Sequence, residues 1–223
     1  MNLSKSLEVF NPNAKTDRIH IIGCGSVGST LAELLTRYGL TRFTLWDFDT
    51  VEPHNIANQK FTQKHIGMTK VEALLDLMCE INPDVRENTK LEPNGWDGQQ
   101  LSGYVFLCPD NIEVRQKIVD KHMYNPYVKA MFDIRTGLFD AQHYAVDWSD
   151  VKGKKNFRAT MNFSHEEAKQ AAPVSACNIQ LGVAATVRLI CDLCIANFTN
   201  FWNGSGLKKM ILMDSNPLQI DAI

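Results

Sequence analysis

The sequence GCGSVG at residues 23–28 lies between an apolar run and a stretch that favours a helix. The apolar run, Arg18–Ile22, is typical of a strand that is buried on both faces. Residues 26–38 repeat apolar side chains on one helix face, and residues 42–46 follow as a second apolar run. Two strands joined by a helix within about 30 residues form a βαβ unit. The sequence therefore predicts an open α/β sheet with a glycine-rich first turn.

Strands and helices continue to alternate after this unit. This alternation predicts a Rossmann-like α/β fold, with a mostly parallel sheet, helices on both faces and antiparallel strands near the C-terminus. We also expect a strand at Val85–Leu91 and a polar, irregular excursion at Lys152–Ala172. A long helix is expected at Ser175–Asn197, and a final strand at Leu207–Met213.

Composition excludes several classes of protein. A chain of 223 residues commonly forms one large α/β domain, so we expect a single domain over residues 1–223. The formal net charge of −2 argues against general nucleic-acid binding, which requires a strongly basic surface. We expect no signal peptide and no membrane span, because no apolar run reaches about 18 residues. The six cysteines, most of them in apolar segments, favour a reduced, cytoplasmic protein.

Each glycine of the turn has its own expected role. Gly23 allows the tight turn, Gly25 lets a phosphate approach the backbone, and Gly28 lets the helix pack on the strand. Amide groups at the start of the helix would then face the phosphate. Asp47 ends the second strand, where an acid binds the ribose of NAD or of ATP equally well. These residues predict a bound nucleotide without distinguishing between the two.

A dense polar stretch follows at residues 51–74, VEPHNIANQKFTQKHIGMTKVEAL, and an ordinary dehydrogenase does not need one. Three side chains, Asn55, Asn58 and Gln59, lie in a segment that could fold over a nucleotide. Lys70 lies near the start of a predicted helix and could place its ammonium group on a phosphate chain. The alternatives are helix capping or turn formation for the asparagines and a solvated surface position for the lysine. To Asp49 we assign a supporting role.

A third polar segment, CPDNIEVR, occupies residues 108–115. Asp110 comes just after a predicted strand, at the edge where open α/β sheets bind ligands. A carboxylate there could hold Mg²⁺, which prefers oxygen ligands. Capping of the next helix by Asp110 and Asn111 is an equally good interpretation. Arg115, one helical turn further on, is expected to reach back to Asp110.

Together these segments resemble the ThiF/MoeB/HesA family, the bacterial relatives of ubiquitin-activating enzymes. The resemblance rests on GCGSVG, LWDFDTVEPHNIANQ, IGMTKVEAL with INPD, and CPDNIEVR, and it extends over 18–134 and 175–194. Members of this family use Mg-ATP to adenylate the C-terminal carboxylate of a small ubiquitin-like or sulfur-carrier protein, releasing pyrophosphate. Some members act on other carboxylates, and the family is usually homodimeric.

The resemblance implies a role for each matching residue. Positions implied to bind the nucleotide are Gly23, Gly25, Gly28, Asp47, Asn58, Gln59, Asn111 and Arg115. Asn55 and Lys70 are implied to act on the phosphates, and Asp110 is the implied magnesium ligand. Cys177, in PVSACNIQLGV, matches a cysteine that links covalently to the carrier in the sulfur-carrier branch. A free cysteine is more commonly a small buried apolar residue, and that alternative stays open for Cys177.

The chain also departs from the family pattern. Asn58 stands where the family usually has an arginine, and residues 1–17 do not match the segment that lends an arginine to the partner subunit. Many members bind zinc through two C-x-x-C pairs, whereas this chain has one, Cys191-x-x-Cys194, within an apolar stretch. Because structural zinc needs four ligands, no zinc site is expected.

The resemblance implies that a carboxylate attacks the α-phosphorus of ATP. A carboxylate is already ionised at pH 7, so this reaction needs no general base. Two alternatives remain. A nucleotide-binding or protein-interaction module that has lost catalysis is favoured by the absent arginines. An NAD-dependent oxidoreductase would leave Asn55, Lys70 and Asp110 without a role.

Overall fold

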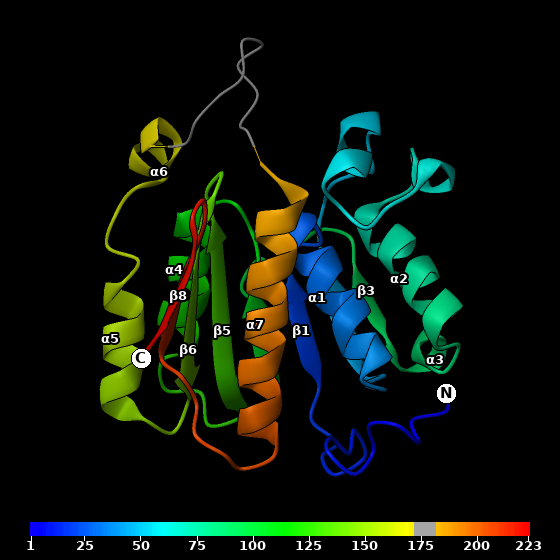
Figure 1. The fold of residues 1–223 in the computed structure, drawn as a ribbon, viewed down its shortest axis with the longest axis horizontal. Helices are drawn as coiled ribbons and strands as arrows, with labels where there is room; N and C mark the ends of the chain where they lie inside the picture. The colour runs from blue at the N-terminus through cyan, green and yellow to red at the C-terminus, as the bar shows by residue number, and fades with distance from the viewer. Residues whose placement is uncertain (172–181) are drawn as a thin grey trace.

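The computed structural model describes residues 1–171 and 182–223, and these form an α/β structure around one eight-stranded sheet (Figure 1). The sheet has the order β3-β2-β1-β4-β5-β6-β7-β8. Its strands are β1 (Ile19–Ile22), β2 (Phe43–Trp46), β3 (Lys90–Glu92), β4 (Gly103–Leu107), β5 (Val128–Thr136), β6 (Asp140–Asp147), β7 (Met210–Ser215) and β8 (Leu218–Ala222). Strands β1 to β5 are parallel, and β6 to β8 are added antiparallel. The expected fold class is therefore confirmed.

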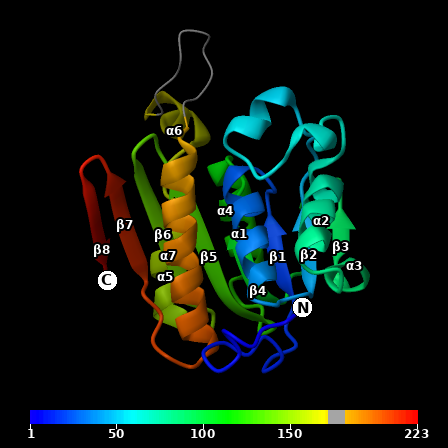
Figure 2. The ribbon, with the colours of Figure 1, turned by 45° about the vertical axis from the view of Figure 1, so that its right-hand side comes forward.

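Helices cover both faces of this sheet (Figure 2). They are α1 (Ser26–Arg37), α2 (Lys70–Ile81), α3 (Val85–Asn88), α4 (Ile112–His122), α5 (Val151–Ala159), α6 (His165–Ala171) and α7 (Ala184–Trp202), with the short 3₁₀ helices η1 (Pro53–Ala57) and η2 (Gln63–His65). Helices α1, α2 and α7 pack on one face, and α4 and α5 pack on the other. Among the described residues, no helix is both long enough and apolar enough to cross a membrane.

The central strands are buried because both of their faces are apolar. In β1, Ile21 belongs to the core under α1 and α7, whereas Ile22 belongs to the core on the α4 side. Phe106 of β4 stacks on Phe132 of β5 at 4.8 Å between ring centroids, and Phe198 of α7 meets both rings edge-on. This double burial fixes the carboxyl ends of β1, β4 and β5 at one edge of the sheet.

The prediction of a strand at Val85–Leu91 is wrong in its first half. Residues 85–88 form α3, and β3 covers only residues 90–92. The side-chain Oδ1 of Asn82 accepts the amide of Asp84 at 3.3 Å, and this turn starts a helix where a short apolar pattern predicted a strand.

The predicted irregular excursion at Lys152–Ala172 is also wrong, because most of it is helical. Asp150 caps α5 by accepting the amide of Gly153 at 2.8 Å. The polar sequence hides a narrow apolar face: Phe157 is buried against Trp148, at 6.5 Å between ring centroids. One buried aromatic residue, Phe157, is too weak a periodic signal to identify this helix from the sequence.

The C-terminal elements extend beyond the predicted bounds. Helix α7 continues to Trp202, because Phe198 and Trp202 in its last turns pack against Phe10. Of the helix predicted at Ser175–Asn197, residues 175–181 lie outside the described residues. The predicted final strand is β7, displaced toward Ser215, and it is followed by β8, which the sequence pattern did not reveal.

Candidate functional site

The polar segments identified from sequence meet at the carboxyl ends of the parallel strands, at the upper edge in Figure 1. Chain order reverses there, because β2 lies on one side of β1 and β4 on the other. The turn after β1 is bonded to both neighbours: the Gly23 amide donates to Trp46 O, and the Cys108 amide donates to Ile22 O, each at 2.8 Å. Such a switch point is where open α/β sheets bind ligands.

Two of the three glycines are required by close packing. Gly23 has a φ of +89°, and a Cβ there would lie 2.8 Å from the carbonyl of Cys108. A Cβ on Gly28 would lie 1.9 Å from the carbonyl oxygen of Gly23, so the first turn of α1 rests directly on the glycine turn. Gly25 differs from both, because nothing in the described chain lies within 4 Å of a Cβ built on it. The turn is therefore open to a ligand at Gly25.

Within the described residues, no acidic side chain caps the start of α1. Gly25 is the N-cap residue and provides no side-chain hydrogen bond, and the first turn contains no acidic residue. The amide groups and the positive end of the helix dipole therefore face the open space beside Gly25. This geometry fits a phosphate group.

Asp47 is turned toward the glycine turn. Its Oδ2 accepts the Cys24 amide at 2.6 Å, its Oδ1 accepts the Asp49 amide at 2.9 Å, and the residue is 8% exposed. Burial raises the pKa of the Asp47 carboxyl, and the two amide donors oppose that rise. The carboxylate is thus fixed between the first two strands, with the remaining lone pairs of its oxygens available to a ribose.

Lys70 begins α2 and is held by Asp49. Its Nζ lies 2.7 Å from Asp49 Oδ2, and its amide donates to Asp49 O at 2.9 Å. Lys70 is 8% exposed, so the interpretation as a solvated surface lysine is wrong. The pairing agrees with the supporting role assigned to Asp49: it holds the ammonium group beside Asp47.

The segment 55–59 lies over the start of α1. Asn55 Oδ1 accepts the Glu52 amide at 2.9 Å, so the capping interpretation applies to this atom. Asn58 binds through its main chain, where its carbonyl oxygen accepts Ser26 Oγ at 2.6 Å. Gln59 is half-buried, and its Oε1 has no hydrogen-bond partner within the described chain. A main-chain contact therefore holds the segment to α1, and the side-chain oxygen of Gln59 has no hydrogen-bond partner within the described chain.

Asp110 and Asn111 are neighbours in sequence but differ in their contacts. Asn111 caps α4, since its Oδ1 accepts the Glu113 amide at 2.8 Å. Asp110 is exposed, and no ion pair or side-chain hydrogen bond joins it to another residue of the described ranges. An exposed carboxylate next to the open glycine turn has the donor chemistry that Mg²⁺ prefers.

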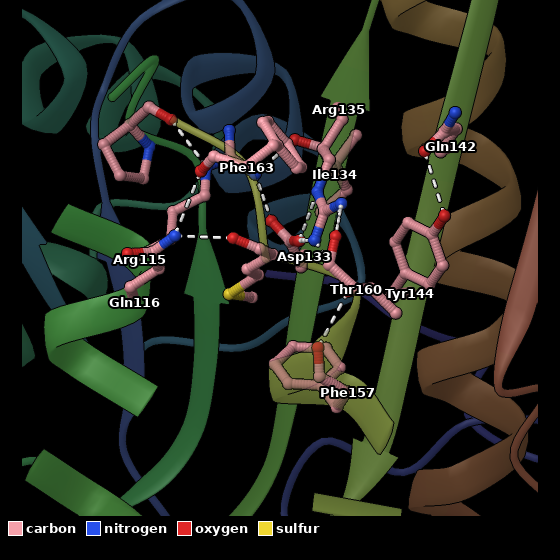
Figure 3. A network of polar contacts seen from close by, with 12 residues as sticks. Arg115, Gln116, Asp133, Ile134, Arg135, Gln142, Tyr144, Phe157, Thr160 and Phe163 are labelled. Carbon is pink, nitrogen blue, oxygen red and sulfur yellow. Dashed lines mark hydrogen bonds and ion pairs between the residues drawn. The ribbon is translucent and has the colours of Figure 1, made fainter. Parts of the chain in front are cut away.

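The expectation that Arg115 reaches back to Asp110 is wrong. The guanidinium group points into the protein (Figure 3), where it pairs with Asp133 and donates to Pro109 O at 2.8 Å and to Ile134 O at 2.9 Å. Asp133 has no exposed surface, so its charge requires a buried cation, whereas Asp110 is solvated.

Sequence reasoning missed Asp133 and Arg135. Arg135 donates to the second carboxylate oxygen of Asp133 at 2.7 Å and to Thr160 O at 2.8 Å. The available signal was the acidic residue in the middle of the apolar run 130–134, AMFDI, because a carboxylate in a buried strand must have partners.

The cysteines near this edge are buried thiols. Burial raises the pKa of Cys108 to about 12 and raises that of Cys24 as well. Cys191 and Cys194 are buried within α7. The described residues contain no group of three metal-ligating side chains. Cys177 lies outside the described residues.

A model of the ThiF family matches residues 8–214 of the chain. The chain belongs to the ThiF family. Ubiquitin-like modifier-activating enzyme 5 of Drosophila virilis is 34% identical over 134 residues, which are 53% of this chain and 32% of that protein. The protein of the same name from Oryza sativa subsp. japonica is 48% identical over 117 residues, or 45% of this chain and 28% of that protein. The alignments thus span about a third or less of these relatives.

Solved structures share the fold at low sequence identity. Escherichia coli MccB with ATP superimposes with a TM-score of 0.69 at 15% identity, covering 94% of this chain and 64% of that one. PaaA superimposes with a TM-score of 0.66 at 13% identity, covering 92% and 63%. The fold is therefore that of these proteins.

Proposed function

We propose that the chain is an ATP-dependent adenylyltransferase that activates a carboxylate and releases pyrophosphate. The observation that supports this most strongly is the open edge at Gly25, where an uncapped helix start follows a turn that contacts Asp47 and the backbone at 108–109. Membership of the ThiF family supports the same reaction, as do relatives named for activating ubiquitin-like modifiers and a structural neighbour solved with ATP.

Each residue of this edge would have a defined part in the reaction. Asp47 would bind the ribose, and the amides at the start of α1 would bind phosphate oxygens beside Gly25. Lys70, held by Asp49, and Asn55 would stabilise the charge that develops as pyrophosphate leaves. Asp110 would hold Mg²⁺, which supplies further charge neutralisation on the phosphates. Asn58, Gln59, Asn111 and Arg115 would complete the site by holding its segments in place.

The proposed acceptor is a small ubiquitin-like or sulfur-carrier protein that ends in glycines. Its C-terminal carboxylate would attack the α-phosphorus and form an acyl adenylate. We further propose a cytoplasmic homodimer, with residues 1–223 as one adenylation domain, and a covalent link between Cys177 and the carrier as a later step. The family supports the homodimer and the link, whereas the chain length supports one domain and the cysteine usage supports the cytoplasmic location.

A second candidate is a module of the same fold that binds nucleotide or protein without catalysis. It is favoured by Asn58, which supplies only a main-chain contact where the family has an arginine, and by Lys70, whose charge is already paired. An NAD-dependent oxidoreductase has no comparable support, because it leaves the exposed Asp110 and the buried Lys70 without a role.

Exchange of labelled pyrophosphate into ATP, measured with a carrier protein that ends in glycines, tests the proposal. The Asp110→Ala variant should lower the exchange rate roughly 100-fold or more, since it removes the magnesium ligand. Asp120→Ala is the matched control: it removes an exposed acid of α4, the helix that follows Asp110, which pairs with Arg158 at the surface, and should leave exchange unchanged. ATP binding without exchange would favour the second candidate, and NAD binding without ATP binding would exclude the proposed adenylyltransferase.

A further inference from the structure

A buried ion network joins β5 to α4, the helix that follows Asp110 (Figure 3). Its centre is Asp133 of β5, which has no exposed surface and carries an arginine on each carboxylate oxygen. In the sheet, Asp133 is the register partner of Leu107, the last residue of β4. The network thus lies at the level where the chain leaves β4 for Asp110, three residues on.

Arg115 connects this centre to the Asp110 backbone. Its Nε donates to the carbonyl oxygen of Pro109 at 2.8 Å, and this oxygen belongs to the peptide group that joins Pro109 to Asp110. On the other side of Asp110, the Asn111 side chain is fixed as the cap of α4. Because the Asp110 side chain has no partner of its own in the described chain, its position depends on these two flanking contacts.

Arg135 connects the same centre to the segment 160–163, which joins α5 to α6 and which we call the connector. The guanidinium group donates to Thr160 O at 2.8 Å and to Thr160 Oγ1 at 2.9 Å. Its carbon lies 4.6 Å from the ring centroid of Tyr144 and 5.6 Å from that of Phe163. Gln116, next to Arg115, donates to Met161 O at 2.5 Å and so holds the connector from the α4 side.

The two carboxylate oxygens of Asp133 therefore accept from different arginines, Oδ1 from Arg115 and Oδ2 from Arg135. Each arginine also donates to main-chain carbonyls, and the Asp133 carboxylate is the group that the two arginines share. Releasing Arg135 would leave Asp133 with one cation and free it to rotate, which would loosen Arg115.

We propose that Asp133 and Arg135 are positioning residues for the Asp110 carboxylate, acting through Arg115, and that they couple the connector to the nucleotide edge. This inference rests on the proposed function, in which Asp110 binds Mg²⁺. Neither residue faces the open space at Gly25, so neither is proposed to contact the substrate. Outer partners of a metal ligand typically change metal affinity when they are altered.

Hydrogen–deuterium exchange of the ligand-free chain tests the coupling without any assay of activity. In Arg135→Gln, we expect exchange about tenfold faster in the connector and also in segment 108–115, whose amides at Cys108 and Glu113 are hydrogen-bonded. Arg37→Gln is the matched control, because it breaks a surface pair with Glu33 within α1 and should change neither segment. Faster exchange in the connector alone, or in neither segment, would overturn the proposal.

The magnesium dependence of pyrophosphate exchange gives the second readout. In Arg135→Gln, the half-saturating Mg²⁺ concentration should rise about 10- to 100-fold, with metal-free ATP affinity unchanged. An unchanged magnesium dependence would overturn the positioning role. Should Arg135→Gln fail to fold, Thr160→Val keeps the arginine, removes one of its acceptors together with the hydroxyl's bond to Phe157 O, and should shift both readouts in the same direction by less. If the unaltered chain shows no pyrophosphate exchange, the proposed function fails, while hydrogen–deuterium exchange still decides the coupling.

Discussion

At the scale of single residues, the site depends on side chains that the fold has already paired. Lys70 is held 2.7 Å from Asp49, and Asp47 is held by two main-chain amides. Charges fixed in this way need little reorganisation when a charged substrate arrives, which is the main source of electrostatic catalysis. Asn58 offers an amide where the family usually has a guanidinium group, so Lys70 is the basic side chain on which the proposed mechanism depends.

Lys70→Ala should lower the rate of pyrophosphate exchange roughly 100- to 1,000-fold, because it removes the cation proposed to act on the leaving phosphates. The matched control is Lys64→Ala, which removes a lysine of the preceding 3₁₀ helix that pairs with Asp76 and Glu80 at the surface. Steady-state exchange assays of both variants check this. A Lys70→Ala variant as active as Lys64→Ala would contradict the role of Lys70.

At the scale of secondary-structure elements, Gly25 and Gly28 have different functions where the glycine turn meets α1. The Gly28 position is filled by the turn itself, whereas the Gly25 position faces open space. Close packing explains the first, and access for a ligand explains the second. The two glycines should therefore respond differently to the same added methyl group.

Gly28→Ala should destabilise the fold by about 1–3 kcal/mol or more, since its Cβ would overlap the carbonyl oxygen of Gly23. Gly25→Ala should leave the free energy of unfolding nearly unchanged and weaken ATP binding, because its methyl group would occupy the space proposed for a phosphate. Chemical denaturation and calorimetric titration with ATP measure the two effects. Unimpaired ATP binding by a folded Gly25→Ala variant would refute a phosphate site at this turn.

Local pattern was sufficient to predict the βαβ unit, the fold class and the strand that delivers Asp110, because buried strands and amphipathic helices leave a clear period in the sequence. It failed at Val85–Leu91, where a turn overrides a short apolar run. It also failed for Arg115, whose partner Asp133 lies 18 residues away on another element. Pairing across elements leaves no local period, so the network around Asp133 could not be predicted.

At the scale of the whole molecule, two buried histidines tie stability to pH. Burial lowers the pKa of His143 to about 4 and that of His20 to about 3. Above about pH 6.5 both histidines are neutral in the folded and the unfolded chain, so they add no pH dependence. Below that, the unfolded chain binds protons that the folded chain does not, so the free energy of unfolding falls as the pH drops toward 4.

Each buried histidine should contribute a slope of up to about 1.4 kcal/mol per pH unit between about pH 6.5 and 4. His143→Gln should reduce the slope, even if the loss of its contact with Asn197 lowers stability throughout. The exposed His54, changed to Gln, should leave the slope unchanged. Denaturation curves across this range give the slopes, and an unaltered slope in His143→Gln would contradict this assignment.

The central claim is that this edge of the sheet joins AMP to a carboxylate. It is tested most directly by labelling the acceptor carboxylate with heavy oxygen and following the label by mass spectrometry after the adenylate is released. Attack on the α-phosphorus predicts one labelled oxygen in AMP and none in inorganic phosphate or pyrophosphate. Label in inorganic phosphate, or AMP without label, would contradict the account.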